Sequence, residues 1–148
     1  VRKLRAAFPE QFIGGIQDSP FAQTQCPDLI LSEHSTWKRI YLHRMKHSKI
    51  CIASTGLHQS SGWKIAEYLA AGRAIVSEPL CYEVPGPFQG ENYLTYTSAD
   101  GCIEQIRTLL AHPEQILQMG QRNRAYYDEW LRPDQIVTKA LEQAKILL

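Results

Sequence analysis

The stretch ICIASTGLHQSSGWKIAEYLAAGRAIVS, residues 50–77, decides the fold. It begins and ends with short runs, 50–54 and 74–77, that are apolar nearly throughout, as strands covered on both faces are. Between them a polar turn leads into a helical pattern over 63–71, and Gly72 suits the position just after a helix end. A strand, a helix and a second strand in this order predict a right-handed βαβ unit with two parallel strands.

The same alternation of strands and helices extends on both sides of this unit. Further strands are predicted at residues 12–16, 28–32 and 93–96, and further helices at 36–46, 99–111, 114–130 and after Pro133. In the last helix, Ile136, Val137, Ala140, Leu141 and Ala144 fall on one stripe that is typical of a core-facing surface. We therefore expect an α/β, Rossmann-like three-layer domain: a parallel sheet of about five strands flanked by helices, with the C-terminal helices packing back on the sheet.

Length and composition limit the function classes. The chain has 148 residues, of which 44% are hydrophobic and 21% charged, which is typical of one folded domain. With 16 Lys and Arg against 15 Asp and Glu, the formal net charge is +1, and a nucleic-acid partner is not expected. No apolar run approaches the roughly 18 residues of a membrane span. The chain starts at Val1 without a secretory signal, so we expect residues 1–148 to be one domain of a longer polypeptide.

The four cysteines indicate a compartment and exclude some kinds of site. Cys26, Cys51, Cys81 and Cys102 are irregularly spaced and form no C-x-x-C pair, which argues against a zinc site and a disulfide scaffold. Cys51 lies inside an apolar run, where it is expected to be a small buried hydrophobic residue. The cysteines therefore favour a reducing compartment, and we expect a cytoplasmic location.

The turn before the 63–71 helix is the strongest candidate for a ligand site. Gly62 lets backbone approach a ligand, Ser61 is an acceptable N-cap, and the first N–H groups of a helix attract anions. Lys64 would add a positive charge, so a diphosphate is a suitable ligand. An ordinary capped helix start explains the same residues equally well.

Two side chains near this turn can bind sugar hydroxyls. Glu67 lies one turn inside the helix, where a carboxylate either complements the helix dipole or accepts hydrogen bonds from two vicinal ribose hydroxyls. His58 precedes the helix and can hydrogen-bond a phosphate or a sugar hydroxyl, although a loop histidine without a ligand is the commoner case.

The residues GWKIAEYLAAGRAIV, 62–76, resemble the signature E-x-F-G-x(4)-E-A-x-A-x-G-x-P-V-V of GT-B glycosyltransferases, found in their C-terminal, nucleotide-sugar-binding domain. Glu67 matches the second Glu, which in that family holds the ribose, and Gly62 matches the glycine whose backbone approaches the diphosphate or sugar. The segment GENYLTY, 90–96, is similar to the family's G-x-N-x-x-x-Y/F strand, and the resemblance covers about residues 46–148. Gln59, Ser61 and Ala74 stand where the signature has Glu, Phe and Pro, which looks like the divergent glycosyltransferase-like branch.

The resemblance implies the donor-binding half of a two-domain hexosyltransferase of polysaccharide biosynthesis. Its substrate would be a nucleoside diphosphate sugar of the UDP or GDP type, with no required cofactor and no metal site. The acceptor would be held by an N-terminal domain of the same protein, so residues 1–148 alone would be inactive. The site residues that the resemblance and the turn together indicate are His58, Gln59, Ser61, Gly62, Trp63, Lys64 and Glu67.

Other interpretations remain open at the level of sequence. One alternative is a flavodoxin-like or receiver-like protein-interaction module. Receiver domains need clustered acidic residues at strand ends, and Glu33, Glu78 and Asp100 are scattered. A degenerate sugar-nucleotide-binding domain without turnover would fit the uncharged Gln59. The basic residues of 37–49 suit a solvated helix face, or alternatively peripheral contact with the inner face of an anionic membrane that carries a lipid-linked acceptor.

Overall fold

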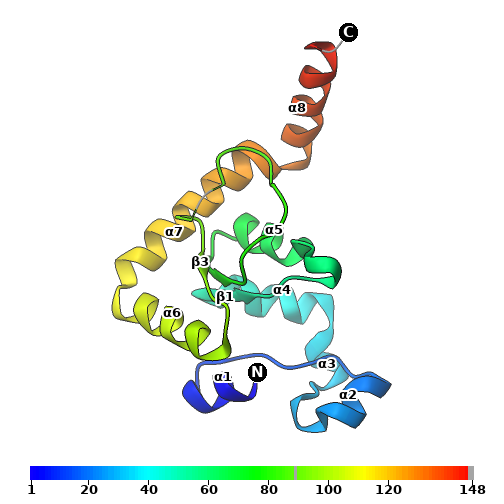
Figure 1. The fold of residues 1–148 in the computed structure, drawn as a ribbon, viewed down its shortest axis with the longest axis vertical. Coiled ribbons are helices and arrows are strands. Elements are labelled where there is room, and N and C mark those ends of the chain that lie inside the picture. Colours follow the sequence, from blue (N-terminus) through cyan, green and yellow to red (C-terminus); the bar gives the residue numbers. More distant parts are fainter. Residues whose placement is uncertain (89, 147–148) are drawn as a thin grey trace.

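A parallel sheet with the strand order β1-β2-β3 forms the centre of the computed structural model, which describes residues 1–88 and 90–146 (Figure 1). The strands are β1 (Ile50–Ala53), β2 (Ala74–Ser77) and β3 (Leu94–Thr95). The helices are α1 (Arg2–Ala7), α2 (Pro20–Gln25), α3 (Glu33–Thr36), α4 (Lys38–His47), α5 (Gly62–Ala70), α6 (Ala99–Ala111), α7 (Pro113–Tyr126) and α8 (Pro133–Ile146). Two 3-10 turns, η1 (Pro27–Leu29) and η2 (Leu57–Gln59), and a π-helical turn, η3 (Tyr127–Leu131), complete the elements.

The predicted βαβ unit is confirmed. Ile50 pairs with Ala74 and Ala53 with Ser77, so β1 and β2 run parallel and α5 connects them. The helix α5 ends as Gly72 predicts: this residue has φ +61°, its N–H bonds the Leu69 carbonyl, and the Arg73 N–H bonds that of Tyr68 at 3.0 Å. These two bonds form a Schellman motif, which satisfies carbonyls at the helix end.

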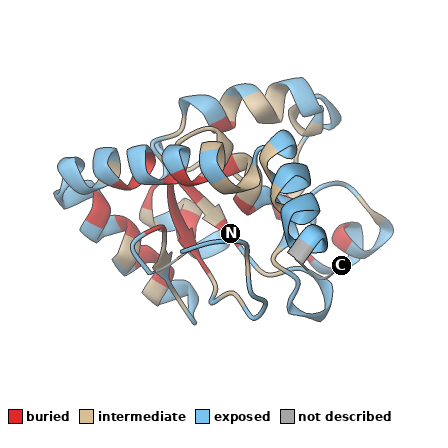
Figure 2. Ribbon diagram, turned by 90° about the horizontal axis from the view of Figure 1, so that it is seen from above, coloured by how far each residue is buried: buried red, intermediate tan, exposed pale blue. Residues whose placement is uncertain are grey.

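Helices cover both faces of the sheet and make three layers. Along β2, Ala74 and Val76 pack into a core with α1, α6 and Met119 of α7, whereas Ile75 packs into a second core with α4 and α5. This alternation follows from the two-residue period of a strand. Figure 2 shows that the buried residues gather at the sheet and on the helix faces that cover it.

The helix α7 packs back on the sheet, as expected of the C-terminal helices. Its Asn123 is fully buried; the side-chain amide donates to the Arg73 carbonyl at 2.7 Å and accepts from the Asn92 side chain at 3.0 Å. At Gly120 the helix passes so close to Gly72 that an added Cβ would lie 2.5 Å from the Gly72 carbonyl oxygen. The α7 backbone is thereby fixed against the end of α5.

The prediction of about five strands is wrong for the described residues, which hold a three-stranded sheet. The segments 12–16 and 28–32 meet only in an isolated parallel bridge between Ile16 and Ile30. Leu29 is part of a 3-10 turn, the Gly14 carbonyl accepts from the Arg5 guanidinium, and Ile13 is 63% exposed. Instead of extending the sheet, Ile16, Leu29 and Ile30 contribute to a separate small core around Ala22 and Cys26, whereas Phe12 packs against the core that contains α1 and α6.

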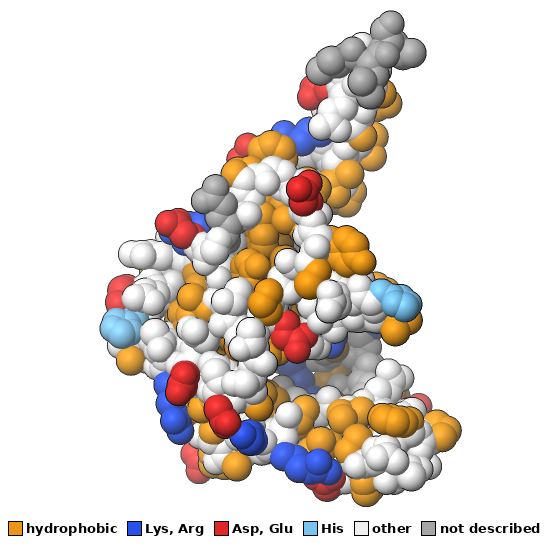
Figure 3. Space-filling model, in the orientation of Figure 1, with side chains coloured by type: hydrophobic (Ala, Val, Ile, Leu, Met, Phe, Trp, Pro, Cys, Tyr) orange, Lys and Arg blue, Asp and Glu red, His pale blue; other side chains and the backbone are white. Residues whose placement is uncertain are grey.

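The expectation that the last helix also packs back on the sheet is wrong. α8 projects away from the sheet (Figure 1), and Ile136, Val137 and Leu141 are 44%, 58% and 59% exposed. Figure 3 shows hydrophobic side chains along this helix. The chain turns away because η3 ends at Leu131 and Arg132 is extended, so that α8 starts in a new direction.

Candidate functional site

The candidate site begins where the chain leaves β1 and turns into α5. Within this turn the Gly56 N–H donates to the Ser60 carbonyl at 2.8 Å, which closes a tight loop. His58 and Gln59 have φ values of 54° and 60°, in the left-handed region that residues other than glycine rarely occupy. Such backbone conformations cost free energy and persist where the surrounding structure holds them. The loop is thus held in one shape immediately before the helix.

The amino end of α5 is open. Ser61 is the N-cap, but its side chain accepts no hydrogen bond from the first turn. Gly62 has φ +62°, and a Cβ placed there would meet none of the described atoms within 4 Å. Trp63 follows with 76% of its surface exposed. The first N–H groups of this helix are therefore accessible to a ligand, and their partial positive charge favours an anion.

Hydrogen bonds tie the loop before α5 to the segment after β2. The Glu78 carboxylate accepts from the Thr55 N–H at 2.7 Å and from the Thr55 hydroxyl at 2.9 Å. The Tyr82 hydroxyl donates to the His58 carbonyl at 3.1 Å. The sequence does not predict these links. Glu78 directly follows the strand next to β1, and this position is the one sequence feature that indicates it could reach the loop. The hydrogen bonds link the segments that follow the two strands at the carboxyl edge of the sheet.

Glu67 faces α4. Its carboxylate accepts a hydrogen bond from the Tyr41 hydroxyl at 2.7 Å and pairs with the Lys38 ammonium. The Glu67 side chain is 22% exposed, so that solvent still reaches it, but it lines neither of the two cavities described below. The amphipathic pattern of residues 63–71 places Glu67 on the helix but gives no indication that α4 supplies its partners.

The predicted site residues divide into two groups. Around the amino end of α5, the structure brings together Ser61, Gly62, Trp63 and the exposed Lys64, with His58 and Gln59 exposed on the preceding loop. Glu67 lies one turn further along α5, on the side that contacts α4, and the Lys38 ammonium that pairs with it is 5.9 Å from the centre of the Trp63 ring.

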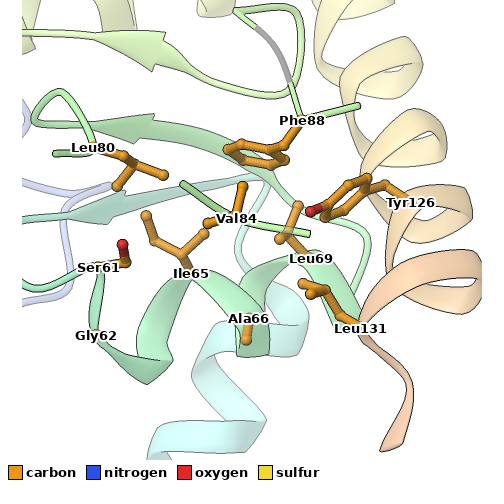
Figure 4. Close-up of a pocket in the computed structure, with 10 residues that line it drawn as sticks. All are labelled: Ser61, Gly62, Ile65, Ala66, Leu69, Leu80, Val84, Phe88, Tyr126 and Leu131. Atoms are coloured by element: carbon orange, nitrogen blue, oxygen red, sulfur yellow. The ribbon is translucent and has the colours of Figure 1, made fainter. Parts of the chain in front are cut away.

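Two cavities lie near the segment that follows β2. The first, of about 120 Å³, is bordered by Ser61 and Gly62 and is otherwise apolar (Figure 4). The close-up shows Ile65 and Leu69 of α5 directed toward Val84 and Phe88. This first cavity is smaller than a typical ligand pocket, which has a volume of roughly 300–1,000 Å³. The second, of about 360 Å³, is lined by Leu80, Tyr82, Glu83, Val84, Gly86, Phe88 and Tyr93.

Three further properties limit the kinds of site that the described residues can form. The described residues hold no group of three or more His, Cys, Asp or Glu placed to bind a metal ion. The four cysteines are free, and burial raises the pKa of Cys51 to about 12, which keeps its thiol protonated. None of the described helices is long and apolar enough to cross a membrane.

Comparison with known proteins gives one similarity. A family model described as glycosyl transferase-like matches residues 22–142, from α2 into α8. No curated protein and no solved structure matches the chain. The matched range contains the turn before α5, the whole of α5 and its contacts with α4.

Proposed function

The chain belongs to the glycosyl transferase-like family, and we propose that it binds a nucleoside diphosphate sugar, the donor of a glycosyl group. The observation that carries this proposal is the open amino end of α5, after the loop that follows β1, where the Ser61 side chain caps no N–H group and Gly62 leaves space. Unpaired N–H groups at a helix start bind phosphate groups through hydrogen bonds and the helix dipole. In parallel α/β sheets, ligands bind at this carboxyl edge of the strands.

Under this proposal, each residue near the turn has a role. The backbone of residues 61–63 binds the diphosphate, and the exposed Lys64 adds a positive charge. Fixed dipoles of this kind stabilise the negative charge that develops on the leaving diphosphate. Gln59 and His58 are exposed on the loop; Gln59 is proposed to hydrogen-bond a sugar hydroxyl, and His58 a phosphate or a sugar hydroxyl.

Glu67 is proposed to bind the ribose. It lies five residues after Gly62, about 7.5 Å along the helix axis, which suits a ribose attached to a diphosphate at the helix start. A carboxylate accepts hydrogen bonds from both vicinal hydroxyls. Lys38 and Tyr41 already contact the carboxylate, so ribose would either share it with them or replace one of them.

The remaining parts of the proposal concern the whole protein. We expect the donor to be of the UDP or GDP type, and an acceptor domain N-terminal to this one to complete a hexosyltransferase. A cytoplasmic location, with the basic face of α4 near an anionic membrane, would bring the site to a lipid-linked acceptor.

The alternatives differ in what the contacts support. A receiver-like module is disfavoured by family membership, and its acidic residues are engaged elsewhere: Asp100 pairs with Lys3, and Glu78 with Thr55. A degenerate domain that binds nucleotide without turnover shares the same site, and Gln59 in place of a carboxylate favours it. Assay of glycosyl transfer by the full polypeptide distinguishes it from an active enzyme.

Calorimetry with UDP, GDP and ADP tests the proposal directly. We expect at least one of them to bind, and Glu67→Ala to weaken binding by about 1–3 kcal/mol, the scale of a lost hydrogen bond to a charged group. Glu104→Ala, at an exposed glutamate of α6 on the opposite face of the sheet, is the matched control and should change nothing. Equal affinities of the Glu67→Ala variant and the unmodified chain would remove the ribose role.

A further inference from the structure

The two oxygens of the Glu67 carboxylate have different partners from α4. Oε1 pairs with the Lys38 ammonium, and Oε2 accepts from the Tyr41 hydroxyl at 2.7 Å. The Lys38 side chain is 63% exposed and that of Glu67 is 22% exposed. Each of the two oxygens proposed to bind ribose therefore already has one partner from this chain's own side chains.

The two partners of Glu67 differ in burial: Tyr41 is half-buried, whereas Lys38 is exposed. Tyr41 is half-buried in the core between α4, α5 and the sheet, and burial, followed by the hydrogen bond to Glu67, raises its pKa. Its hydroxyl therefore stays protonated and continues to donate at neutral pH. Lys38 is an exposed ammonium on a flexible four-carbon chain, which can exchange one anionic partner for another. Oε1 is thus the oxygen that can be released.

Lys38 also lies beside the start of α5. Its Nζ is 5.9 Å from the centre of the Trp63 ring, and Trp63 belongs to the first turn of that helix. The ammonium therefore contacts the carboxylate and also lies near the side chain of a first-turn residue of α5. Neither helical periodicity nor motif spacing assigns this role to Lys38, which precedes Glu67 by 29 residues.

We propose that Lys38 is an exchangeable counter-ion: it neutralises Glu67 in the empty site and transfers to the diphosphate when nucleotide binds, leaving Oε1 free for the ribose. Tyr41 is the positioning residue that holds Oε2 throughout. The inference rests on the proposed function, and it adds that ribose recognition is coupled to the presence of the phosphates. A nucleoside alone displaces Lys38 without giving it a new partner, so it binds poorly.

The proposal predicts opposite effects of one substitution on two ligands. For Lys38→Met, uridine should bind about two- to fivefold more tightly, because an exposed ion pair no longer competes with the ribose. UDP should bind about fivefold or more weakly, because its phosphates lose a charged hydrogen-bond partner. Where GDP is the tighter ligand of the unmodified chain, GDP and guanosine replace UDP and uridine.

The experiment measures both dissociation constants, by calorimetry for the diphosphate and by chemical-shift titration for the nucleoside. Lys46→Met is the matched control: it removes the same charge from the same helix, eight residues or about 12 Å away. It should shift both affinities little and in the same direction. Tyr41→Phe should weaken both ligands in parallel, and thermal unfolding of each variant verifies that the fold is kept.

The outcomes separate the inference from the function beneath it. Opposite shifts for Lys38→Met support the exchange. Parallel shifts, or none, while the unmodified chain binds the diphosphate, overturn the exchange and leave the proposed function intact. If the unmodified chain binds neither the diphosphates nor the nucleosides, both the proposed function and the exchange are wrong.

Discussion

The helices α5 and α8 each carry an apolar stripe, but the stripe of α5 is buried and that of α8 is exposed. In α5, Ile65 and Leu69 are 6% and 1% exposed, whereas Val137 and Leu141 of α8 are 58% and 59% exposed. The difference lies in the chain on either side. α5 connects two paired parallel strands, so both of its ends are fixed to the sheet and its apolar face must lie on it. α8 follows an extended Arg132, which directs the helix away from the sheet (Figure 1).

An amphipathic pattern therefore predicts a helix more reliably than it predicts the surface that the helix covers. The pattern reports which side chains share a face. Whether that face meets the sheet depends on connections at both ends, which the pattern does not contain. Substitutions in the two regions can measure this difference in free energy.

Leu69→Ala should have the largest effect. The side chain is 1% exposed and lies in the core between α5 and the sheet, so its removal leaves a cavity. We expect the free energy of unfolding to fall by about 2–5 kcal/mol, measured by urea denaturation. Leu117→Ala on α7, where the leucine is 63% exposed, is the control and should have little effect. A loss below about 1 kcal/mol at Leu69 would mean that α5 is not fixed on the sheet as described.

Gly120→Ala should have the next largest effect, because it tests how closely α7 packs against the end of α5. The added Cβ would lie 2.5 Å from the Gly72 carbonyl oxygen, a backbone atom that cannot move away alone. Overpacking costs about 1–3 kcal/mol, and the better helix propensity of alanine recovers up to about 1 kcal/mol. We expect a net loss of about 1–2 kcal/mol in urea denaturation.

A helical glycine with more room provides the control for this substitution. At Gly101 of α6 the nearest atom to an added Cβ is the Ser98 hydroxyl oxygen, at 3.3 Å. Gly101→Ala should therefore cost less stability than Gly120→Ala, because the neighbour is a side-chain hydroxyl and not a backbone carbonyl. If both alanine variants were equally stable, the close contact between α7 and Gly72 would not exist in solution.

The parts of the fold that sequence predicts are those fixed by local chemistry. The strands at 50–54 and 74–77 follow from continuous apolar runs, and the left-handed Gly72 follows from its place after a helical pattern. The open turn before α5 follows from small and polar residues between a strand and a helix. Each of these needs only neighbours in the chain.

The parts that sequence does not predict depend on residues far apart. The apolar runs at 12–16 and 28–32 look like strands, but whether they join the sheet is decided by tertiary packing, and they form one bridge instead. Glu67 is recognisable as a candidate ligand residue, yet its contact with Lys38 requires α4 and α5 to pack together. Residue type and position in the sequence therefore identify candidate site residues, whereas the contacts that these residues make depend on tertiary packing.

Leu141→Ala should have the smallest effect, and it tests the other side of the comparison. The leucine is 59% exposed on α8, so its truncation removes little buried surface, and alanine is an equally good helix former. We expect the free energy of unfolding to change by less than about 0.5 kcal/mol. Leu69→Ala, the same substitution on a buried helix face, is the positive control.

A large effect at Leu141 would reverse the comparison. A loss of 2 kcal/mol or more would mean that the apolar stripe of α8 is buried in solution. Sedimentation velocity on the unmodified chain would then distinguish the two ways of burying it: a dimer indicates that α8 meets a second copy, and a monomer indicates that it folds back on the domain. If Leu141→Ala changes the free energy of unfolding only slightly, the apolar stripe of α8 is exposed in solution as it is in the structure. Helical periodicity alone is then not evidence that a helix face is buried in a core.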